Sequence, residues 1–265
     1  MGKIIAIANQ KGGVGKTTTC VNLAASLAAT KRKVLVIDLD PQGNATMASG
    51  VDKYDVDATA YDLLVEDTPF EDVVIRETSG GYHLIAANGD VTAAEIKLME
   101  VFAREVRLRR ALEGAREKYD FIFIDCPPAL NLLTINALTA SSSVLVPMQC
   151  EYFALEGLTA LMDTISKLAA VVNEELHVEG LLRTMYDPRN RLATEVSDQI
   201  KTHFGDKVYR TVIPRNVRLA EAPSHGKPAM YYDKYSSGAK AYLALAGEML
   251  RREENSVVTG SAVNA

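Results

Sequence analysis

The segment from Lys11 to Thr18, KGGVGKTT, follows a short apolar run and precedes a stretch with helical spacing of apolar residues. Glycines in such a loop let the backbone adopt positive φ and turn its N–H groups toward phosphate oxygens, and the helix that follows adds the positive end of its dipole. Lys16 supplies a cation for the β- and γ-phosphates, and the Thr17 hydroxyl is placed to ligate Mg²⁺. The sequence therefore predicts a P-loop for a nucleoside triphosphate. The residues expected to bind the nucleotide are Lys11, Gly12, Gly13, Val14, Gly15, Lys16, Thr17 and Thr18.

Short apolar runs alternate along the chain with longer stretches whose apolar residues recur at helical spacing. Runs in which both the odd and the even positions are apolar are typical of strands buried on both faces, because alternate side chains point to opposite faces of a sheet. We expect such strands at Ile4–Ala8, Val34–Ile37, Phe121–Ile124, Val144–Pro147 and Leu181–Met185. Helices are expected at Thr17–Ala29, Ala103–Glu117, Leu132–Ala140 and Leu155–Val172. This alternation predicts an α/β fold, a mostly parallel twisted sheet flanked by helices, in a P-loop NTPase arrangement.

The chain of 265 residues fits one domain, because no linker long enough to separate two domains interrupts the pattern. We assign residues 1–252 to this domain, with a terminal helix over Ser237–Arg252. Residues 253–265, EENSVVTGSAVNA, are small and polar, and we expect them to form a disordered tail.

Composition narrows the class of protein further. Hydrophobic residues make up 48% of the chain and charged residues 24%, which is typical of a globular protein with a full core. Three cysteines without CxxC spacing argue against a disulfide framework and against a cysteine-held zinc or iron–sulfur site. No run of about 18 apolar residues and no signal sequence are present, so we expect a cytoplasmic protein.

Two strand ends carry aspartates that suit a Mg²⁺-nucleotide. The sequence DLDPQ after Val34–Ile37 places Asp38 and Asp40 on the same side of a strand end, at the edge of the sheet where ligands bind in open α/β folds. The run FIFI at Phe121–Ile124 ends in Asp125, which has the Walker B pattern of an aspartate that holds a Mg²⁺-bound water. An aspartate at a strand end can also cap a helix. Its position in the chain after a P-loop favours the metal role.

Lys11 is not needed to cradle phosphate, since Lys16 already serves the loop. The sequence KGGVGKT resembles the deviant Walker A motif of the ParA/MinD family of ATPases. The resemblance implies that Lys11 reaches across a nucleotide-sandwich dimer to the phosphates of the partner subunit, the task of an arginine finger. It also implies that Asp40 orients or activates the attacking water and that Asp38 supports the Mg²⁺ shell. A solvated lysine at a strand end is the alternative for Lys11. The expected catalytic residues are thus Lys11, Lys16 and Asp40, and the expected metal residues are Thr17, Asp38 and Asp125.

Two segments nearer the C-terminus resemble the chromosomal ParA/Soj branch of this family. They are RTMYD at Arg183–Asp187 and VIPRNVRLAEAPSHGKP at residues 212–228, and with the P-loop they extend the resemblance over nearly the whole chain. In this branch the region of Pro214 and Asn216 lines the adenine pocket. An asparagine amide carries both a donor and an acceptor, which suits an adenine edge. Seen alone, Asn216 would more often be a turn residue.

The formal charge of −5 conceals a basic segment. Residues 183–240 carry eleven Lys or Arg against six Asp or Glu, and prolines place much of this charge on loops. The ParA-type relatives bind duplex DNA without sequence preference, and such a surface suits contacts to phosphates. Charge that is merely solvated is the alternative. The residues expected to contact DNA are Arg189, Arg191, Arg218, Lys227 and Lys234.

These features predict an ATPase of the chromosome- or plasmid-partition type that uses ATP and Mg²⁺. The resemblance implies a homodimer formed with ATP, nonspecific binding to double-stranded DNA of the nucleoid, and a ParB-like centromere-binding protein that stimulates hydrolysis and so releases the DNA. Three alternatives stay open: a relative that positions another cargo, a MinD-like protein, and a P-loop kinase for a small molecule. Membrane docking is disfavoured, since the chain ends without the bulky apolar helix face that inserts into a bilayer.

Overall fold

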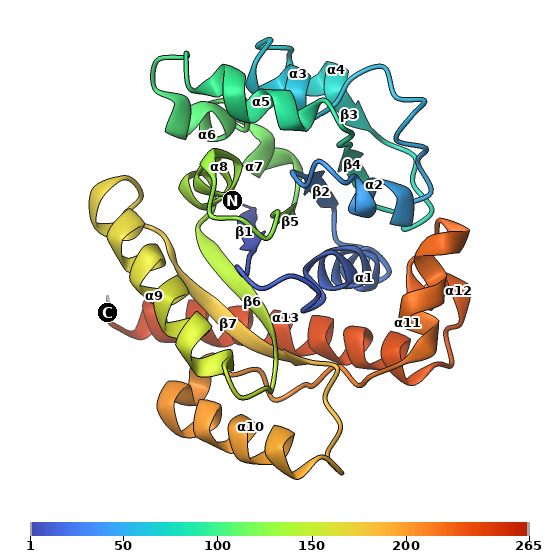
Figure 1. Cartoon of the computed structure of the whole chain (residues 1–265), viewed down its shortest axis with the longest axis vertical. Coiled ribbons are helices and arrows are strands. Elements are labelled where there is room, and N and C mark those ends of the chain that lie inside the picture. The colour runs from blue at the N-terminus through green and yellow to red at the C-terminus, as the bar shows by residue number, and fades with distance from the viewer. Residues whose placement is uncertain (1, 264–265) are drawn as a thin grey trace.

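The computed structural model describes residues 2–263, with side chains described up to Asn255. One sheet runs through the molecule in the order β3-β4-β2-β5-β1-β6-β7 (Figure 1), and its strand pairs are parallel except β3 with β4. The strands are β1 (Lys3–Ile7), β2 (Val34–Asp38), β3 (Val74–Ile75), β4 (His83–Ile85), β5 (Phe121–Asp125), β6 (Ser143–Gln149) and β7 (His177–Thr184). The predicted α/β class with a mostly parallel sheet flanked by helices is confirmed.

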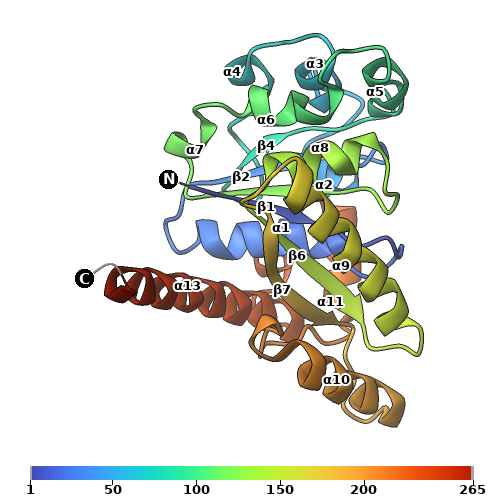
Figure 2. The same cartoon turned by 90° about the vertical axis from the view of Figure 1, so that its left-hand side faces the viewer.

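Helices cover both faces of the sheet (Figures 1 and 2). One face carries α1 (Lys16–Ala28), α2 (Asn44–Ala48), α11 (Val217–Glu221), η3 (Ala222–His225), α12 (Ala229–Tyr232) and α13 (Ser237–Val263). The other face carries α3 (Ala60–Leu64), α4 (Phe70–Val73), α5 (Val91–Leu98), α6 (Arg107–Ala111), α7 (Ala115–Lys118), α8 (Leu132–Ala140), α9 (Ala154–Val171) and α10 (Arg191–Phe204). The 3₁₀ turns η1 (Arg104–Val106) and η2 (Gly205–Lys207) join neighbouring elements.

The sheet divides the core into two layers, because successive side chains of a strand point to opposite faces. In β1, Ile4 and Ala6 pack with the layer of α3 to α10, whereas Ile5 and Ile7 pack against α1 and α13. All four side chains are buried. Burial on both faces explains why the central strands are continuous apolar runs in the sequence.

Parallel strands bring their carboxyl ends to one edge of the sheet. The loop after β1, the end of β2 and the end of β5 therefore meet there, since β5 pairs with both β1 and β2. Figure 1 is viewed toward this edge, and Figure 2 shows the last turns of α13 on the opposite side of the molecule. The predicted P-loop and aspartates thus share one face.

The C-terminal prediction needs a correction. The disordered tail expected for residues 253–265 is wrong for residues 253–263, which continue α13. No proline interrupts this stretch, and Glu253 forms an ion pair with Lys3 at the start of β1. Residues 264–265 lie outside the described residues.

The single helix expected at Ala103–Glu117 is also wrong. The structure divides this stretch into η1, α6 and α7. Ala103 and Gly114 have φ values of 55° and 80°, in the left-handed region that an α-helix cannot contain. The apolar spacing in the sequence correctly indicates that Leu108 and Leu112 are buried. It does not indicate the left-handed backbone at Ala103 and Gly114.

Gly50 lets α2 approach η3 backbone to backbone, and its replacement tests this contact. Its φ is 81°, and a Cβ there would lie 2.9 Å from the Gly226 carbonyl oxygen. We expect Gly50→Ala to lower the free energy of unfolding by about 1–3 kcal/mol, as measured by urea denaturation. Gly157→Ala in α9 is the matched control. Its Cβ meets no atom within 4 Å, so we expect it to raise stability by up to about 1 kcal/mol. Equal effects of the two variants would contradict this account of the packing.

Candidate functional site

The predicted P-loop connects β1 to the first turn of α1. Gly13 and Gly15 have φ values of 71° and 89°, which favour glycine, whereas Gly12 does not adopt positive φ. A Cβ at Gly12 or Gly13 would meet no atom within 4 Å. The loop therefore has an open side, directly before the N-terminus of a thirteen-residue helix. Backbone N–H groups and the helix dipole at such a position suit the oxygens of a phosphate chain.

Side chains from three neighbouring strand ends hold the loop in place. Asn9 accepts a hydrogen bond from the Lys11 N–H at 2.9 Å and donates to the Pro147 carbonyl oxygen at 2.8 Å. Gln149 Nε2 donates to the Gly13 carbonyl oxygen, and Thr184 Oγ1 donates to that of Val14. These bonds fasten the loop to β6 and β7, so the phosphate site is shaped before any nucleotide binds. Asn9, Gln149 and Thr184 were not among the residues predicted from the sequence.

The Lys16 side chain lies inside the loop. It is 6% exposed, and its ammonium donates to the Lys11 carbonyl oxygen at 3.3 Å. Burial lowers the pKa of Lys16, and the nearby carboxylates of Asp125 and Asp40 oppose that shift. No carboxylate of the described residues forms an ion pair with this ammonium. It is therefore available to the β- and γ-phosphates of its own subunit.

Asp125 is a buried carboxylate at the end of β5. Neither of its oxygens has a hydrogen-bond partner among the described residues. Burial raises its pKa well above the usual value, and the carboxylate of Asp38, its register partner on β2, adds to this rise. The Thr17 hydroxyl and Lys16 act in the opposite direction. An unpartnered buried carboxylate beside a threonine hydroxyl fits a Mg²⁺ ion.

The described residues contain no cluster of three or more His, Cys, Asp or Glu side chains that would hold a metal alone. A Mg²⁺ ion at Thr17 and Asp125 would therefore complete its shell with water and nucleotide oxygens, as Mg²⁺ usually does. This matches a metal that arrives with the nucleotide.

Asp38 has partners that Asp125 lacks. Its two oxygens accept hydrogen bonds from the Thr46 N–H, the Thr46 hydroxyl and the Asp40 N–H, at 2.9, 2.8 and 3.1 Å. Burial raises the pKa of Asp38 to about 6, and the hydrogen bonds from Thr46 and Asp40 counteract part of this rise. The structure thus gives Asp38 a second task, holding the start of α2. Its predicted place in the Mg²⁺ shell stays a prediction.

Asp40 follows β2 at the rim of the site and is half-buried. One oxygen accepts a hydrogen bond from the Gln42 N–H at 3.0 Å, which leaves the other oxygen open to a ligand or a water. Its charge acts on both Lys16 and Asp125, so the three groups share one site.

Lys11 lies outside the phosphate cradle. Its ammonium forms an ion pair with Glu151 Oε2 at 2.5 Å, and the two side chains are 49% and 51% exposed. Glu151 stands two residues after the end of β6 and 140 positions away in the chain, so no local sequence signal could have identified the pair.

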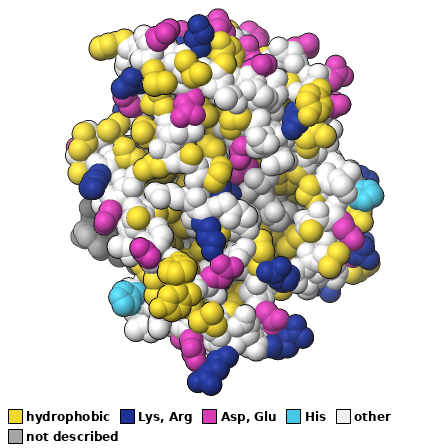
Figure 3. Space-filling view, viewed as in Figure 1, with side chains coloured by type: hydrophobic (Ala, Val, Ile, Leu, Met, Phe, Trp, Pro, Cys, Tyr) yellow, Lys and Arg dark blue, Asp and Glu magenta, His cyan; other side chains and the backbone are white. Residues whose placement is uncertain are grey.

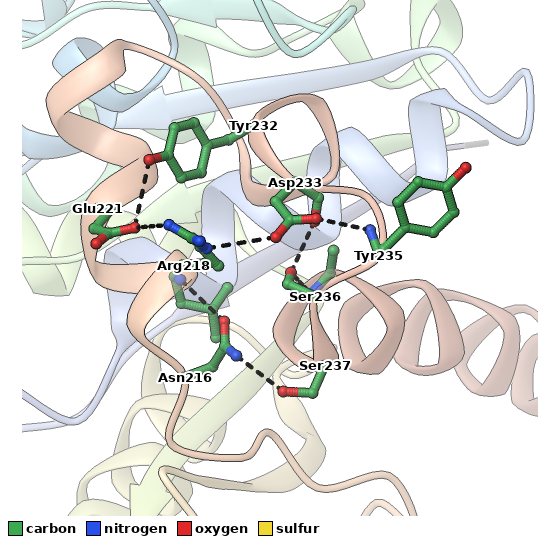
Figure 4. A network of polar contacts seen from close by, with 10 residues as sticks. Asn216, Arg218, Glu221, Tyr232, Asp233, Tyr235, Ser236 and Ser237 are labelled. Atoms are coloured by element: carbon green, nitrogen blue, oxygen red, sulfur yellow. Dashed lines mark hydrogen bonds and ion pairs between the residues drawn. The ribbon is translucent and has the colours of Figure 1, made fainter.

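Pro214 and Asn216 line a cavity of about 170 Å³ that also contacts Gly15 and Thr18 of the loop. The cavity therefore adjoins the phosphate cradle, where the base of a bound nucleotide would lie. Asn216 also caps α11: its Oδ1 accepts from the Leu219 N–H, and its Nδ2 donates to Ser237 Oγ at 2.9 Å (Figure 4). The structure thus shows the local role that an isolated asparagine suggests, and base binding stays a prediction.

The five basic residues predicted to contact DNA are exposed and lie on two segments. Arg189 and Arg191, at the start of α10, pair with Asp187 and Glu195. Arg218 on α11 lies between Glu221, at 2.7 Å, and Asp233, at 3.5 Å (Figure 4). Lys227 and Lys234 form no ion pair with a described residue. Figure 3 shows basic and acidic side chains intermixed on the face that carries the strand ends, so the basic count of the sequence does not produce a uniformly basic surface there.

Known proteins are similar to this chain in sequence and fold. A family model described as an AAA domain matches residues 2–178. The sporulation initiation inhibitor protein Soj of Bacillus subtilis is 55% identical over 94% of this chain and 98% of its own length. The chromosome partitioning protein ParA of Caulobacter vibrioides is 49% identical over 96% of each chain. The structure of cobyrinic acid a,c-diamide synthase from Mycobacterium smegmatis with bound ADP and magnesium is 35% identical over 96% of each chain, with a TM-score of 0.83.

A preformed phosphate loop, a buried unpartnered aspartate and a similar structure with magnesium and ADP define a P-loop enzyme that hydrolyses ATP with Mg²⁺. More narrowly, the chain belongs to the ParA/Soj family of partition ATPases. Within the described residues, no helix has the length and apolar character needed to cross a bilayer.

The raised pKa of Asp125 predicts a pH dependence of metal binding. Protons compete with Mg²⁺ for this carboxylate, because burial favours its neutral form. We expect the affinity of the ADP complex for Mg²⁺ to increase with pH above the range in which an ordinary aspartate ionises, by at most about tenfold per pH unit. Calorimetric titration of Mg²⁺ measures this affinity. Asp125→Asn provides the control, since it retains the ionisation of ADP itself. The same pH dependence in both proteins would refute the assignment.

Proposed function

We propose that this protein is a chromosome-partition ATPase whose ATP-bound dimer holds DNA without sequence preference. The proposal rests on the different positions of the two loop lysines, Lys11 and Lys16. Lys16 is buried within the loop and can serve the phosphates of its own subunit, whereas Lys11 points to the rim and Glu151. A cation on the rim suits phosphates bound by a second copy, so the full set of charges around the triphosphate forms when two copies meet.

In such a dimer the side chains of each subunit divide the work. The loop N–H groups and Lys16 hold the β- and γ-phosphates. Thr17 and Asp125 would hold Mg²⁺, and the ion would supply positive charge against the phosphate oxygens. Asp40 orients a water and accepts its proton as the water oxygen attacks the γ-phosphorus. The bond from phosphorus to the bridging oxygen breaks, and ADP and phosphate leave. Loss of the γ-phosphate removes the group that Lys11 of the other subunit binds, so the dimer separates.

The five exposed basic residues are the proposed DNA contacts. Lys227 and Lys234 form no ion pair with a described residue, so they can bind DNA phosphates without losing a partner. Each arginine would exchange a carboxylate partner for a phosphate. Both kinds of contact depend on charge rather than on base identity, which supports binding without sequence preference. Two copies of each segment in a dimer would double the number of contacts, so affinity for DNA would rise with dimerisation.

A ParB-like centromere-binding protein is the proposed stimulating partner, and nucleoid DNA the proposed location. Support comes from the names of the two relatives that match nearly the whole chain, a chromosome partitioning protein and Soj. The similarity to the Mycobacterium smegmatis synthase, at 35% identity, gives an ATP-dependent amide synthase as a second candidate. That candidate requires consumption of an amide donor, whereas the partition ATPase releases phosphate with water alone.

Replacement of Lys11 tests the dimer. We expect Lys11→Ala to bind ATP within a few-fold of the unchanged protein, because Lys16 and the loop remain, but to stay monomeric with ATP. Partner-stimulated hydrolysis should fall by on the order of 10³-fold, as for the loss of an arginine finger. Light scattering after size-exclusion chromatography measures the mass. Lys16→Ala is the contrasting variant, since it should lose nucleotide binding itself. A stable ATP dimer of Lys11→Ala would refute the proposal.

Replacement of Lys227 tests the DNA surface. Because this lysine forms no ion pair in the described chain, Lys227→Ala should leave folding and ATP-driven dimerisation unchanged. We expect weaker binding of the dimer to any duplex sequence, and a slope of log affinity against log salt that is smaller by about 1 for each phosphate that is no longer neutralised. Fluorescence anisotropy over a salt series measures both. Lys33→Ala, at the opposite end of the sheet, is the control and should not change the slope. Equal slopes for all three proteins would exclude Lys227 from the surface.

A further inference from the structure

The Lys11–Glu151 ion pair lies on a rigid frame. Asn9 and Gln149 tie the loop to β6, the strand that leads into Glu151. The Glu151 backbone is itself held, since its N–H donates to the Gln149 carbonyl oxygen at 3.0 Å and its carbonyl oxygen accepts from the Ala154 N–H at 2.9 Å. Both side chains thus extend from fixed backbone, and their approach at 2.5 Å needs little further ordering.

The pair competes with the role given to Lys11 above. Glu151 is the only side chain among the described residues that pairs with the Lys11 ammonium. The ammonium has three N–H donors, so one carboxylate does not use up its hydrogen-bonding capacity, but the pair holds the lysine toward its own subunit and places a negative charge where the phosphates of a second copy would approach. Dimer formation must therefore weaken or break the Lys11–Glu151 pair, and the carboxylate competes with the triphosphate at each of the two lysines.

We propose that Glu151 is a positioning residue that retains Lys11 on its own subunit and so sets how much ATP is needed for dimerisation. This inference rests on the proposed function. A triphosphate carries more negative charge than a single carboxylate and can displace it, whereas ADP lacks the γ-phosphate that would face the rim. Because Lys11 leaves this carboxylate only when a γ-phosphate is present, Glu151 raises the amount of ATP needed for dimerisation, and it returns Lys11 to its own subunit after hydrolysis.

The size of the effect follows from the exposure of the pair. Both side chains are about half exposed, so the free energy of the ion pair is similar to that of other surface ion pairs. Its loss should favour the dimer by about two- to fivefold for each subunit. Because a dimer breaks two such pairs, its dissociation constant should fall by roughly four- to twenty-five-fold.

The test compares Glu151→Gln with a matched variant, Glu71→Gln. Glutamine keeps the shape of the side chain and removes its charge. Glu71 is 49% exposed, pairs with Arg76 and Lys118, and belongs to α4 on the edge of the sheet that carries β3. Sedimentation velocity with a non-hydrolysable ATP analogue gives the dimer dissociation constant of each protein at low and high salt.

We expect Glu151→Gln to have a lower dimer dissociation constant than the unchanged protein. Glu71→Gln should have the same dissociation constant as the unchanged protein, and that of Glu151→Asp should be close to it. The advantage of Glu151→Gln should shrink toward onefold at about 0.5 M salt, because salt screens exposed charges. A merely structural role would not produce this salt dependence. If the unchanged protein dimerises and Glu151→Gln does so equally or less well, the inference about Glu151 is wrong. If the unchanged protein stays monomeric with the analogue, the proposed function itself fails.

Discussion

Two carboxylates buried side by side at the ends of β2 and β5 are the constraint on which the site depends. Asp38 and Asp125 are register partners without measurable exposure, and burial disfavours the ionised form of each, while the charge of Asp38 adds to the effect at Asp125. The pKa of Asp38 lies near 6, above its ordinary value of 3.8, which means that ionisation costs folding stability as the pH rises from about 4 through about 6. In the proposed site, a divalent cation would offset that cost. The fold therefore buries two carboxylates whose ionised forms are disfavoured, and Mg²⁺ bound with a nucleotide would favour their ionised forms. A binding site that stabilises the protein when filled is a natural basis for a switch.

The same carboxylates connect the nucleotide site to the proposed DNA surface. Asp38 holds Thr46 at the start of α2 through two hydrogen bonds, and α2 ends beside Gly50. The backbone of Gly50 touches that of Gly226, which follows η3 and directly precedes Lys227. Ser79 reinforces this contact by donating to the Gly226 carbonyl oxygen at 2.6 Å. A change in the charge or position of Asp38 thus acts on a continuous set of contacts that leads to the basic segment. Coupling of this kind would make DNA binding depend on the nucleotide.

The sequence revealed the parts of the site that are contiguous in the chain. The P-loop is one uninterrupted motif, and the central strands are predictable within a residue or two because both of their faces are buried. The breaks at Ala103 and Gly114 depend on backbone conformation, which apolar spacing does not encode. The helix α10 escaped prediction because only one narrow side of it is apolar, and β3 and β4 are too short to give a pattern. The partners of the loop, Gln149, Thr184 and Glu151, come from distant strand ends. Only the register of the sheet brings them to the loop.

The two loop lysines show why a preformed site alone does not make an efficient enzyme. Lys16 is desolvated, and its position near the carboxylates of Asp125 and Asp40 suits permanent contact with phosphate. Lys11 remains half exposed and is held by a carboxylate that a phosphate can displace. If both cations were fixed inside one cradle, a single subunit would complete the charge stabilisation of the transition state and would hydrolyse ATP without any link to assembly. Under the proposed function, separation of the second cation from its own cradle would make the chemistry conditional on a second copy. Isolated subunits would then hydrolyse ATP slowly, and the bound nucleotide would depend on the state of assembly.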